Sequence, residues 1–534
     1  MPQNIKSGIT FGLVGGLLTF LFGGWSVAVI GVLMGIGLGL ALSGRLQKAP
    51  ALTLVRSALP AAAVSAVVLL VLSLLQNFVV DPAIGKFPDG LGLVIPANIA
   101  GVLGGLVMAL VTTALHALPA RQEQLGRLVL IALIVVAFPF VDNFTGLRWM
   151  AQVIFALIFV ILGMGLNIVV GYAGLLDLGY AAFFAIGAYT TGILSSPQHN
   201  IFLNFWLVIW IAAAVAAMFG LLLGAPTLPL RGDYLAIVTL GFGEIIPVVF
   251  RNLIDVTIQE PLSCWIIPGI QRLFGASSTV ACITLTSHLD LTAGEKGINP
   301  IGRPVLPFIG AFSSAQPITW YFLIIAIILL SIFLINRLHD SRIGRAWKAI
   351  REDQLAAEQM GIDPVRTKLM AFAMGATFSG FAGAFYASYI SGIFPGVFDF
   401  SASILILCTV ILGGIGNIYG VLVGGLALLT ADRLFLPALK DFLGGLLHHS
   451  ILPALASHPT LQTFVEDNAN PILWRYLLFG LTLVIMMSVR PEGLVPNPQR
   501  RMELHEAEFE AGGPEAVPGA ATPESATSAE QPSM

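Results

Sequence analysis

The chain has 534 residues, of which 57% are hydrophobic and only 10% are charged, with a formal net charge of −3. Soluble globular proteins carry about 25% charged residues, so this composition excludes a soluble protein over most of the length. The nearly balanced charge, with no cationic stretch interleaved with aromatic residues, gives no support to nucleic-acid binding.

Long apolar segments follow one another along the chain, as expected for membrane-spanning helices. They are continuous, whereas the strands of a membrane β-barrel would alternate apolar and polar residues. The first apolar segment, 9–42, is long enough for two crossings, with the turn at Gly23 and Gly24. The segments lie at 9–42, 58–80, 93–117, 125–141, 149–170, 174–195, 205–224, 234–250, 318–337, 368–392, 403–429 and 475–489.

Basic residues in the short loops predict the orientation in the membrane. If residues 338–367, here named the charged island, face the cytoplasm, then the loop 251–317 lies outside. The other basic loops also fall inside under this one assumption; they contain Arg45, Lys48, Arg56, Arg121, Arg127 and Arg231.

Segment 403–429 contains the break LGGIGNIYG. A single crossing there would put Arg490, Arg500 and Arg501 outside, against the positive-inside rule. A re-entrant pair of helices keeps them inside, and non-helical backbone is tolerated at membrane depth where protein surrounds it. The alternative is an additional short span within 442–456. We therefore predict an all-α polytopic membrane protein with about 12 transmembrane helices plus a re-entrant helix pair.

Three regions are expected from these patterns. Residues 1–120 form an N-terminal membrane extension of about four helices, and 121–497 form the main membrane domain. Residues 498–534 form a tail rich in Pro, Glu, Ser and Gly, whose low hydrophobicity predicts disorder.

The charged island has the sequence signals of two helix starts. Asp353 is placed to cap a short helix that stops at Gly361. Asp363 and Pro364 then begin a second helix, because proline is tolerated in the first turn. Upstream, Ile343, Trp347 and Ile350 recur with helical spacing and form an amphipathic stripe.

Two interpretations of the island remain open. Its basic residues could anchor an interfacial helix to anionic lipid. Alternatively, another protein docks there, because acidic side chains are poorly placed for lipid and small ones permit close approach. The acidic residues are Glu352, Asp353 and Glu358, and the small ones are Ala356, Ala357 and Gly361.

Several motifs, taken together, resemble one transporter family. Ala356, Ala357 and Gly361 match the E-A-A-x-x-x-G coupling motif of ABC importer permeases, although Leu355 stands where the glutamate would be. The stretches GLNIVVGYAGLLDLGYAAFFAIGAYTTGIL, LRGDYLAIVTLGFGEII, TAGEKGI, GRAWKAIREDQLAAEQMGI, VILGGIGNIYGVLVGGLALL and MSVRPEGL follow in this order. Over roughly 125–497 the chain resembles LivM-type permeases of branched-chain amino-acid ABC transporters.

The resemblance implies a permease subunit in the bacterial cytoplasmic membrane, with no enzymatic activity or cofactor of its own. It would pair with a LivH-type permease, two ABC ATP-binding subunits that bind ATP and Mg, and an external substrate-binding protein. The sequence has no G-x-x-x-x-G-K-[ST] phosphate-binding loop, which agrees with ATP hydrolysis on another chain. The residues implied in ATPase coupling are Arg351, Glu352, Asp353, Ala356, Ala357, Glu358 and Gly361.

Candidates for the substrate path are polar or irregular positions within apolar segments, since ionisable groups at membrane depth usually face protein or a cavity. Glu244 could pair with a substrate ammonium group or a partner helix, or lie near a helix end and bond to the backbone or to Thr239. Asp177 could line the path or act as a turn acid. The glycines at the break could form a discontinuous helix at the path or a packing surface; they include Gly413, Gly414 and Gly416.

Cys264 and Cys282 lie in the predicted external loop, where oxidation is possible, so they are candidates for a disulfide or two free thiols. The third cysteine, Cys408, is expected to be a small buried apolar residue. The external loop could receive a binding protein or only cap the helices.

Other functions stay open at this stage. A urea or short-amide ABC permease would share the family but carry another substrate. An ion-coupled secondary transporter would need inverted repeats and coupling residues that are not evident. A membrane-embedded enzyme is disfavoured, because the histidines lack metal-ligand spacing such as H-E-x-x-H.

Overall fold

The structure is a computed structural model. It describes residues 3–22, 25–43, 51–83, 91–199, 203–227, 233–254, 290–306, 310–313, 316–452, 470–490 and 492–495. In this part of the chain nearly all regular structure is helical, which confirms the predicted all-α class. The one two-stranded sheet pairs β1 (Val305–Leu306) with β2 (Gly310–Ala311) in antiparallel register.

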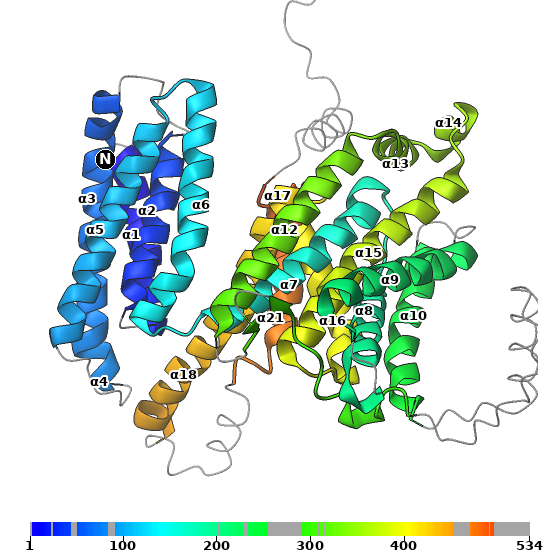
Figure 1. The fold of residues 1–534 in the computed structure, drawn as a ribbon. Helices are drawn as coiled ribbons and strands as arrows, with labels where there is room; N and C mark the ends of the chain where they lie inside the picture. The colour runs from blue at the N-terminus through cyan, green and yellow to red at the C-terminus, as the bar shows by residue number, and fades with distance from the viewer. Residues whose placement is uncertain are drawn as a thin grey trace, which may run out of the picture.

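The N-terminal helices pack together into a bundle, and α6 lies beside them (Figure 1). The predicted double crossing of the first apolar segment is confirmed by two helices, whereas its turn residues, Gly23 and Gly24, lie outside the described residues. The helices are α1 (Gln3–Phe22), α2 (Ser26–Ser43), α3 (Ala51–Leu75) and α5 (Leu91–Leu115), with a π-helical turn (Gln76–Val80) and α4 (Asp81–Ala83) between the last two.

Glycines bring α2 and α5 into backbone contact. A Cβ atom on Gly31 would overlap the carbonyl oxygen of Gly101, and one on Gly35 would overlap that of Gly105. Because the hydrophobic effect does not drive helices together in lipid, such close approach supplies the van der Waals contact that holds the pair.

The main domain surrounds α7, whose residues are almost all buried. Helices α12, α15, α16 and α17 pack directly against it. The elements are α6 (Ala120–Thr145), α7 (Met150–Asn167), the π-helical turn η2 (Ile168–Tyr172), α8 (Ala181–Ser195), α9 (Phe205–Thr227), α10 (Asp233–Asn252), α12 (Pro317–His339), α13 (Arg342–Glu352), α14 (Gln354–Gln359), α15 (Pro364–Ile390), α16 (Phe400–Gly413), α17 (Ile418–Thr430), η6 (Ala431–Phe435), α18 (Leu436–Leu446), η7 (Leu447–Ile451) and α21 (Arg475–Val489).

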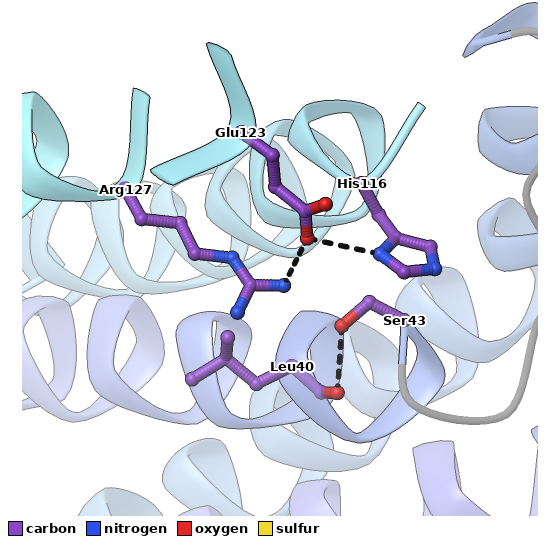
Figure 2. Close-up of polar contacts among 5 residues, drawn as sticks. All are labelled: Leu40, Ser43, His116, Glu123 and Arg127. Atoms are coloured by element: carbon purple, nitrogen blue, oxygen red, sulfur yellow. Dashed lines mark hydrogen bonds and ion pairs between the residues drawn. The ribbon is translucent and has the colours of Figure 1, made fainter. Parts of the chain in front are cut away.

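Helix α6 connects the bundle to the main domain. At its start, Glu123 Oε1 accepts a hydrogen bond from Arg127 Nη2 at 2.6 Å and lies 3.0 Å from His116 Nδ1 (Figure 2). Further along, the hydroxyl of Tyr321 on α12 donates to the carbonyl oxygen of Val135 at 3.0 Å. Polar contacts thus fix α6 to both of its neighbours.

Eleven helices among the described residues are long and apolar enough to cross a membrane, and α8, α16 and α21 are shorter apolar helices. The chain is a multi-pass membrane protein. Figure 1 places α13 and α14 at the same end of the molecule as the α5–α6 junction, with α4 at the opposite end. The basic loop around Arg121 and Arg127 is therefore on the island's side, as the charge pattern predicted.

The break in segment 403–429 is the turn of a helical hairpin. Gly413 at the end of α16 packs on Gly420 of α17, and Gly414 and Gly416 in the turn have φ values of 117° and 85°. The second arm is longer than the sequence suggested, because the helix runs on through η6 and α18 as one span-length segment, Ile418–His449. Its far part includes the start of 442–456, which therefore forms no separate span within the described residues.

Candidate functional site

The charged island contains the two helix starts predicted from its sequence. Asp353 Oδ1 accepts hydrogen bonds from Leu355 N at 2.8 Å and Ala356 N at 3.1 Å, and so caps α14. Gly361 follows the helix with φ of 82°, a left-handed conformation that glycine adopts without strain. The predicted cap and stop of this short helix are confirmed.

The second helix start predicted in the charged island, at Asp363 and Pro364, is confirmed as well. Asp363 Oδ1 accepts from Val365 N at 2.9 Å and from Arg366 N at 3.2 Å, and Pro364 occupies the first turn of α15. The chain therefore makes a sharp turn between two capped helices, which fixes α14 relative to the long helix α15.

The amphipathic stripe on α13 packs against protein rather than lipid. Trp347 and Ile350 are buried, and Ile343 packs against the main core. The indole Nε1 of Trp347 donates to the carbonyl oxygen of Thr367 at 2.8 Å. The apolar side of α13 is therefore occupied by α15 and the core, and anchoring of its basic residues to anionic lipid stays an open alternative.

Helix α14 exposes apolar side chains at the end of the molecule. Ala357 is buried against the chain, whereas Leu355 is 61% exposed and Met360 84% exposed. Ala356 and Glu358 are exposed beside them. The two exposed apolar side chains thus lie on a short helix that is capped at its start and stopped by Gly361.

Hydrogen bonds connect the island to two interrupted helices. Arg351 Nη1 donates to the carbonyl oxygen of Gly171, in the π-helical turn after α7, at 2.6 Å. One turn earlier, the buried Asn167 Oδ1 accepts from Gly416 N, in the α16–α17 turn, at 2.8 Å. The island, η2 and the hairpin turn thus form one continuous set of contacts.

Residues 492–495 complete this region. Leu494 N donates to the carbonyl oxygen of Leu412 at 2.9 Å, and Val495 N donates to that of Gly413 at 3.1 Å. The sequence analysis missed this pairing and the role of Asn167. An isolated amide within an apolar run was a usable signal, because a buried amide needs partners.

The structure brings together two of the three polar path candidates. Asp177 Oδ1 accepts from Gly179 N at 2.9 Å, and Thr239 Oγ1 accepts from Leu178 N at 3.1 Å. Both side chains are buried, so Asp177 is confirmed as a turn acid. They line a cavity of about 10 Å³, roughly the size of one water molecule, together with Gly179, Phe183, Leu223, Phe242 and Phe372.

Glu244 lies apart from this cluster. It is exposed on the outward face of α10, between the exposed apolar side chains of Ile237 and Val248. The hydroxyl of Thr239 donates to the carbonyl oxygen of Ala236, so the alternative in which Glu244 bonds to Thr239 is not found. Glu244 is the twelfth residue of α10, roughly 16 Å from its start at 1.5 Å per residue.

The remaining predicted positions are placed as follows. Gly413, Gly414 and Gly416 form the hairpin turn and its packing surface, away from the Asp177 cavity. Cys408 is a buried free thiol, as predicted. Cys264 and Cys282 lie outside the described residues.

The described part of the external loop covers helix ends. Trp206 Nε1 on α9 donates to the carbonyl oxygen of Val305 at 3.1 Å, and Ser196 Oγ after α8 donates to that of Pro300 at 2.9 Å. The described part of the loop thus contacts the ends of α8 and α9, and its docking of a binding protein stays a prediction. No group of three or more His, Cys, Asp or Glu side chains placed to hold a metal ion occurs among the described residues.

Comparison with known proteins gives consistent matches. The family described as "Branched-chain amino acid transport system / permease component" matches residues 149–487. The high-affinity branched-chain amino acid transport system permease protein LivM of Escherichia coli is 36% identical over 382 residues, 71% of this chain and 77% of the relative. LivM of Salmonella typhimurium is 35% identical over 390 residues, 72% and 79% of the two chains.

The permease protein LivH of Salmonella typhimurium is 29% identical over 176 residues, which is 31% of this chain and 54% of the relative. No solved structure matches the chain significantly.

The contact between Asn167 and the hairpin turn can be tested by mutation. We expect Asn167→Ala to lower the stability by about 1–3 kcal/mol, because it removes a buried side-chain acceptor that bonds Gly416 N. Thermal unfolding of the detergent-solubilised protein measures this. The control is Asn336→Ala on α12, whose side chain is only half-buried; equal melting temperatures for both variants would contradict the assignment.

Proposed function

The chain belongs to the family of permease components of branched-chain amino acid transport systems, and from this membership we propose that it is the LivM-type membrane subunit of an ATP-driven ABC importer. The proposed cargo is a branched-chain or related neutral amino acid, which an external binding protein delivers and which leaves toward the cytoplasm. The observation that carries the proposal is α14, a capped helix with Leu355 and Met360 exposed at the island's end.

In this proposal ATP and Mg are bound by two separate ATP-binding subunits, and this chain has no enzymatic activity. Helix α14 rests in a surface groove of one of these subunits, with Leu355, Ala356 and Met360 toward the groove. Ala357 faces inward, which keeps α14 attached to its own chain. Glu352 and Glu358 lie at the exposed rim, where opposite charges on the partner would set the orientation.

The contacts of the island suggest how motion would pass into the membrane domain. A displacement of α14 pulls on α13 through the shared residue Asp353, and Trp347 transfers it to the first turn of α15. Arg351 transfers it to Gly171, and Asn167 to the α16–α17 turn. Helix α15 and both interrupted segments would therefore respond together, as in rigid-body gating.

Glu244 is proposed to face the second permease and the path between the two subunits. A carboxylate at the middle of a spanning helix is costly toward lipid, so its exposed position on α10 fits a surface that protein or water covers. A cargo ammonium group is the natural partner of such a carboxylate. The match to LivH supports a second permease of related fold as the covering subunit.

The other path candidates are proposed to shape the wall of the path. Asp177 and Thr239 hold the turn before α8. Gly413 lets the two arms of the hairpin pack closely on each other, and Gly414 and Gly416 allow its tight turn. A cargo with an apolar side chain needs few polar contacts along such a wall.

Of the other functions considered, a urea or short-amide permease differs only in cargo, and the names of the relatives favour the amino-acid cargo. An ion-coupled transporter and a membrane-embedded enzyme are both disfavoured, because the relatives are components of transport systems.

The subunit composition is tested by a pull-down of the tagged full-length chain from mild detergent, followed by mass spectrometry. We expect a second permease and P-loop ATPases to be recovered, and an external binding protein to associate more weakly. Recovery of the chain alone, while a known ABC transporter stays intact in the same detergent, would overturn the proposal.

The role of α14 is tested with the double variant Leu355→Glu and Met360→Glu. Both side chains are exposed, so we expect unchanged insertion and melting temperature. Transport in reconstituted vesicles should fall at least about fivefold, because loss of a central apolar contact costs more than about 1 kcal/mol. The control is Leu355→Met with Met360→Leu, and equal transport by both double variants would refute the assignment.

The role of Glu244 is tested by Glu244→Gln, which keeps the size and removes the charge. We expect cargo uptake by the reconstituted complex to fall about tenfold or more, the typical effect of losing a charge-assisted contact. Glu295→Gln in the exposed external loop is the control. Unchanged uptake by Glu244→Gln would remove this residue from the path.

A further inference from the structure

A second polar cluster lies far from the island and from the Asp177 cavity. Three elements enclose a cavity of about 280 Å³: the start of α7, the η6–α18 segment and the start of α21. We name it the outer pocket, and it shares no lining residue with the Asp177 cavity. Its lining consists of Gln152, Asp432, Arg433, Leu436, Pro437, Ile472 and Arg475.

The outer pocket carries a net positive charge. The carboxylate of Asp432, a residue only 4% exposed, lies 3.0 Å from Arg475 Nε through Oδ1 and 3.3 Å from Arg433 Nε through Oδ2. Both arginines thus use Nε toward the carboxylate. In the described part of the chain, their terminal Nη atoms form no hydrogen bond or ion pair, so two guanidinium groups remain available beside one buried acid.

The arginines are held in place before any ligand arrives. The guanidinium carbon of Arg433 lies 3.9 Å from the ring centroid of Phe155, a cation–π contact that orients the side chain. Asp432 and Arg433 are both part of the π-helical turn η6, and such turns occur frequently at functional sites. Such a fixed pair of guanidinium groups is suited to bidentate binding of an oxyanion.

The position of the outer pocket indicates the source of the anion. Gln152 is the third residue of α7 and Arg475 the first of α21, and α18 lies at the end of the molecule opposite α13 and α14 (Figure 1). Trp474 and Tyr476 are 49% and 55% exposed next to Arg475. Aromatic side chains of this kind concentrate at the membrane–water interface.

Apolar surface continues from the pocket along α21. Leu477, Leu481 and Val484 are exposed on this helix, and they offer a face for hydrocarbon chains. Within the pocket, Leu436, Pro437 and Ile472 form an apolar wall beside the two guanidinium groups. The site therefore fits an anionic head group that carries an apolar tail.

We propose that the outer pocket binds the phosphate of a phospholipid in the outer leaflet, with its acyl chains along α21. Arg433 and Arg475 bind the phosphate oxygens through their Nη atoms, and Gln152 offers a further amide donor at the rim. Basic pockets between transmembrane helices bind lipid head groups by the same chemistry. A free amino acid also carries an oxyanion and an apolar group. The outer pocket, however, is lined by other residues than the Asp177 cavity, which belongs to the proposed cargo path.

The site is tested with a photoreactive phosphatidylglycerol in nanodiscs that contain the full-length chain. Peptide mass spectrometry of the unmutated protein is expected to place the cross-links in peptides that contain Pro437 or Ile472. Cross-links confined to other peptides would overturn the proposal, and this mapping needs no variant.

The matched variants are Asp432→Asn with Arg475→Gln, and Asp363→Asn with Arg366→Gln. The first removes an ion pair of the pocket without leaving a buried carboxylate alone. The second makes the same changes in an exposed pair at the other end, where Arg366 Nε lies 3.2 Å from Asp363 Oδ2. We expect lipid labelling of the Asp432→Asn, Arg475→Gln variant to fall about tenfold relative to the unmutated protein. Labelling of the Asp363→Asn, Arg366→Gln variant should not change. Equal labelling of both would overturn the site.

Competition distinguishes the sources of the anion. Displacement of the lipid probe by unlabelled phosphatidylglycerol, but not by free leucine, supports a lipid site. Displacement by leucine at concentrations that leave the nanodisc intact would overturn it in favour of a cargo carboxylate.

Discussion

Backbone groups at the interrupted helices of this protein are hydrogen-bonded by side chains from other helices. Asn167 on α7 binds Gly416 N in the hairpin turn, and Thr239 on α10 binds Leu178 N before α8. The hydroxyl of Tyr180 donates to the carbonyl oxygen of Gly375 on α15 at 2.6 Å. Because no water is present in hydrocarbon to take these bonds, the breaks can exist only where such partners reach them. These contacts join α7, α8, α10, α15 and the hairpin turn at the points where the helices are interrupted.

In the proposed coupling, the same contacts allow the interrupted helices to shift at their breaks. A continuous helix moves as a rod, whereas a break supported by a neighbouring side chain moves when that neighbour moves. The island is attached to this system through Arg351 and Trp347, each bound to a carbonyl oxygen of another segment. Its short helix α14 carries the exposed apolar side chains of Leu355 and Met360. A docked subunit would therefore act on these breaks through a rigid element, which is what a transporter driven from outside the membrane domain requires.

The N-terminal bundle is built differently from the main domain. Its helices meet through glycine contacts such as Gly35 with Gly105. It meets the main domain through α6, through α1 against α18, and through Phe22 against Trp149. The family match begins at residue 149, at the start of α7, so the bundle and α6 lie outside the matched region. The coupling contacts, the Asp177 cavity and the outer pocket all lie in the matched part of the chain or directly at its end. The bundle thus adds membrane contact without entering the contact set around the island.

The sequence by itself determined those features whose causes are local. Composition and segment length required a helical membrane protein, and Asp353, Gly361, Asp363 and Pro364 set the ends of the island's helices, because caps act on neighbouring residues. The break at Gly414 and Gly416 was visible for the same reason.

Only the tertiary structure decided which side of a helix meets which neighbour. It placed Glu244 outward and Thr239 inward on one helix, and it paired Asn167 with Gly416, 249 residues away. It also gathered Asp432, Arg433 and Arg475 around one cavity. These arrangements depend on how distant helices pack, and helical periodicity within a uniformly apolar segment does not mark the buried face.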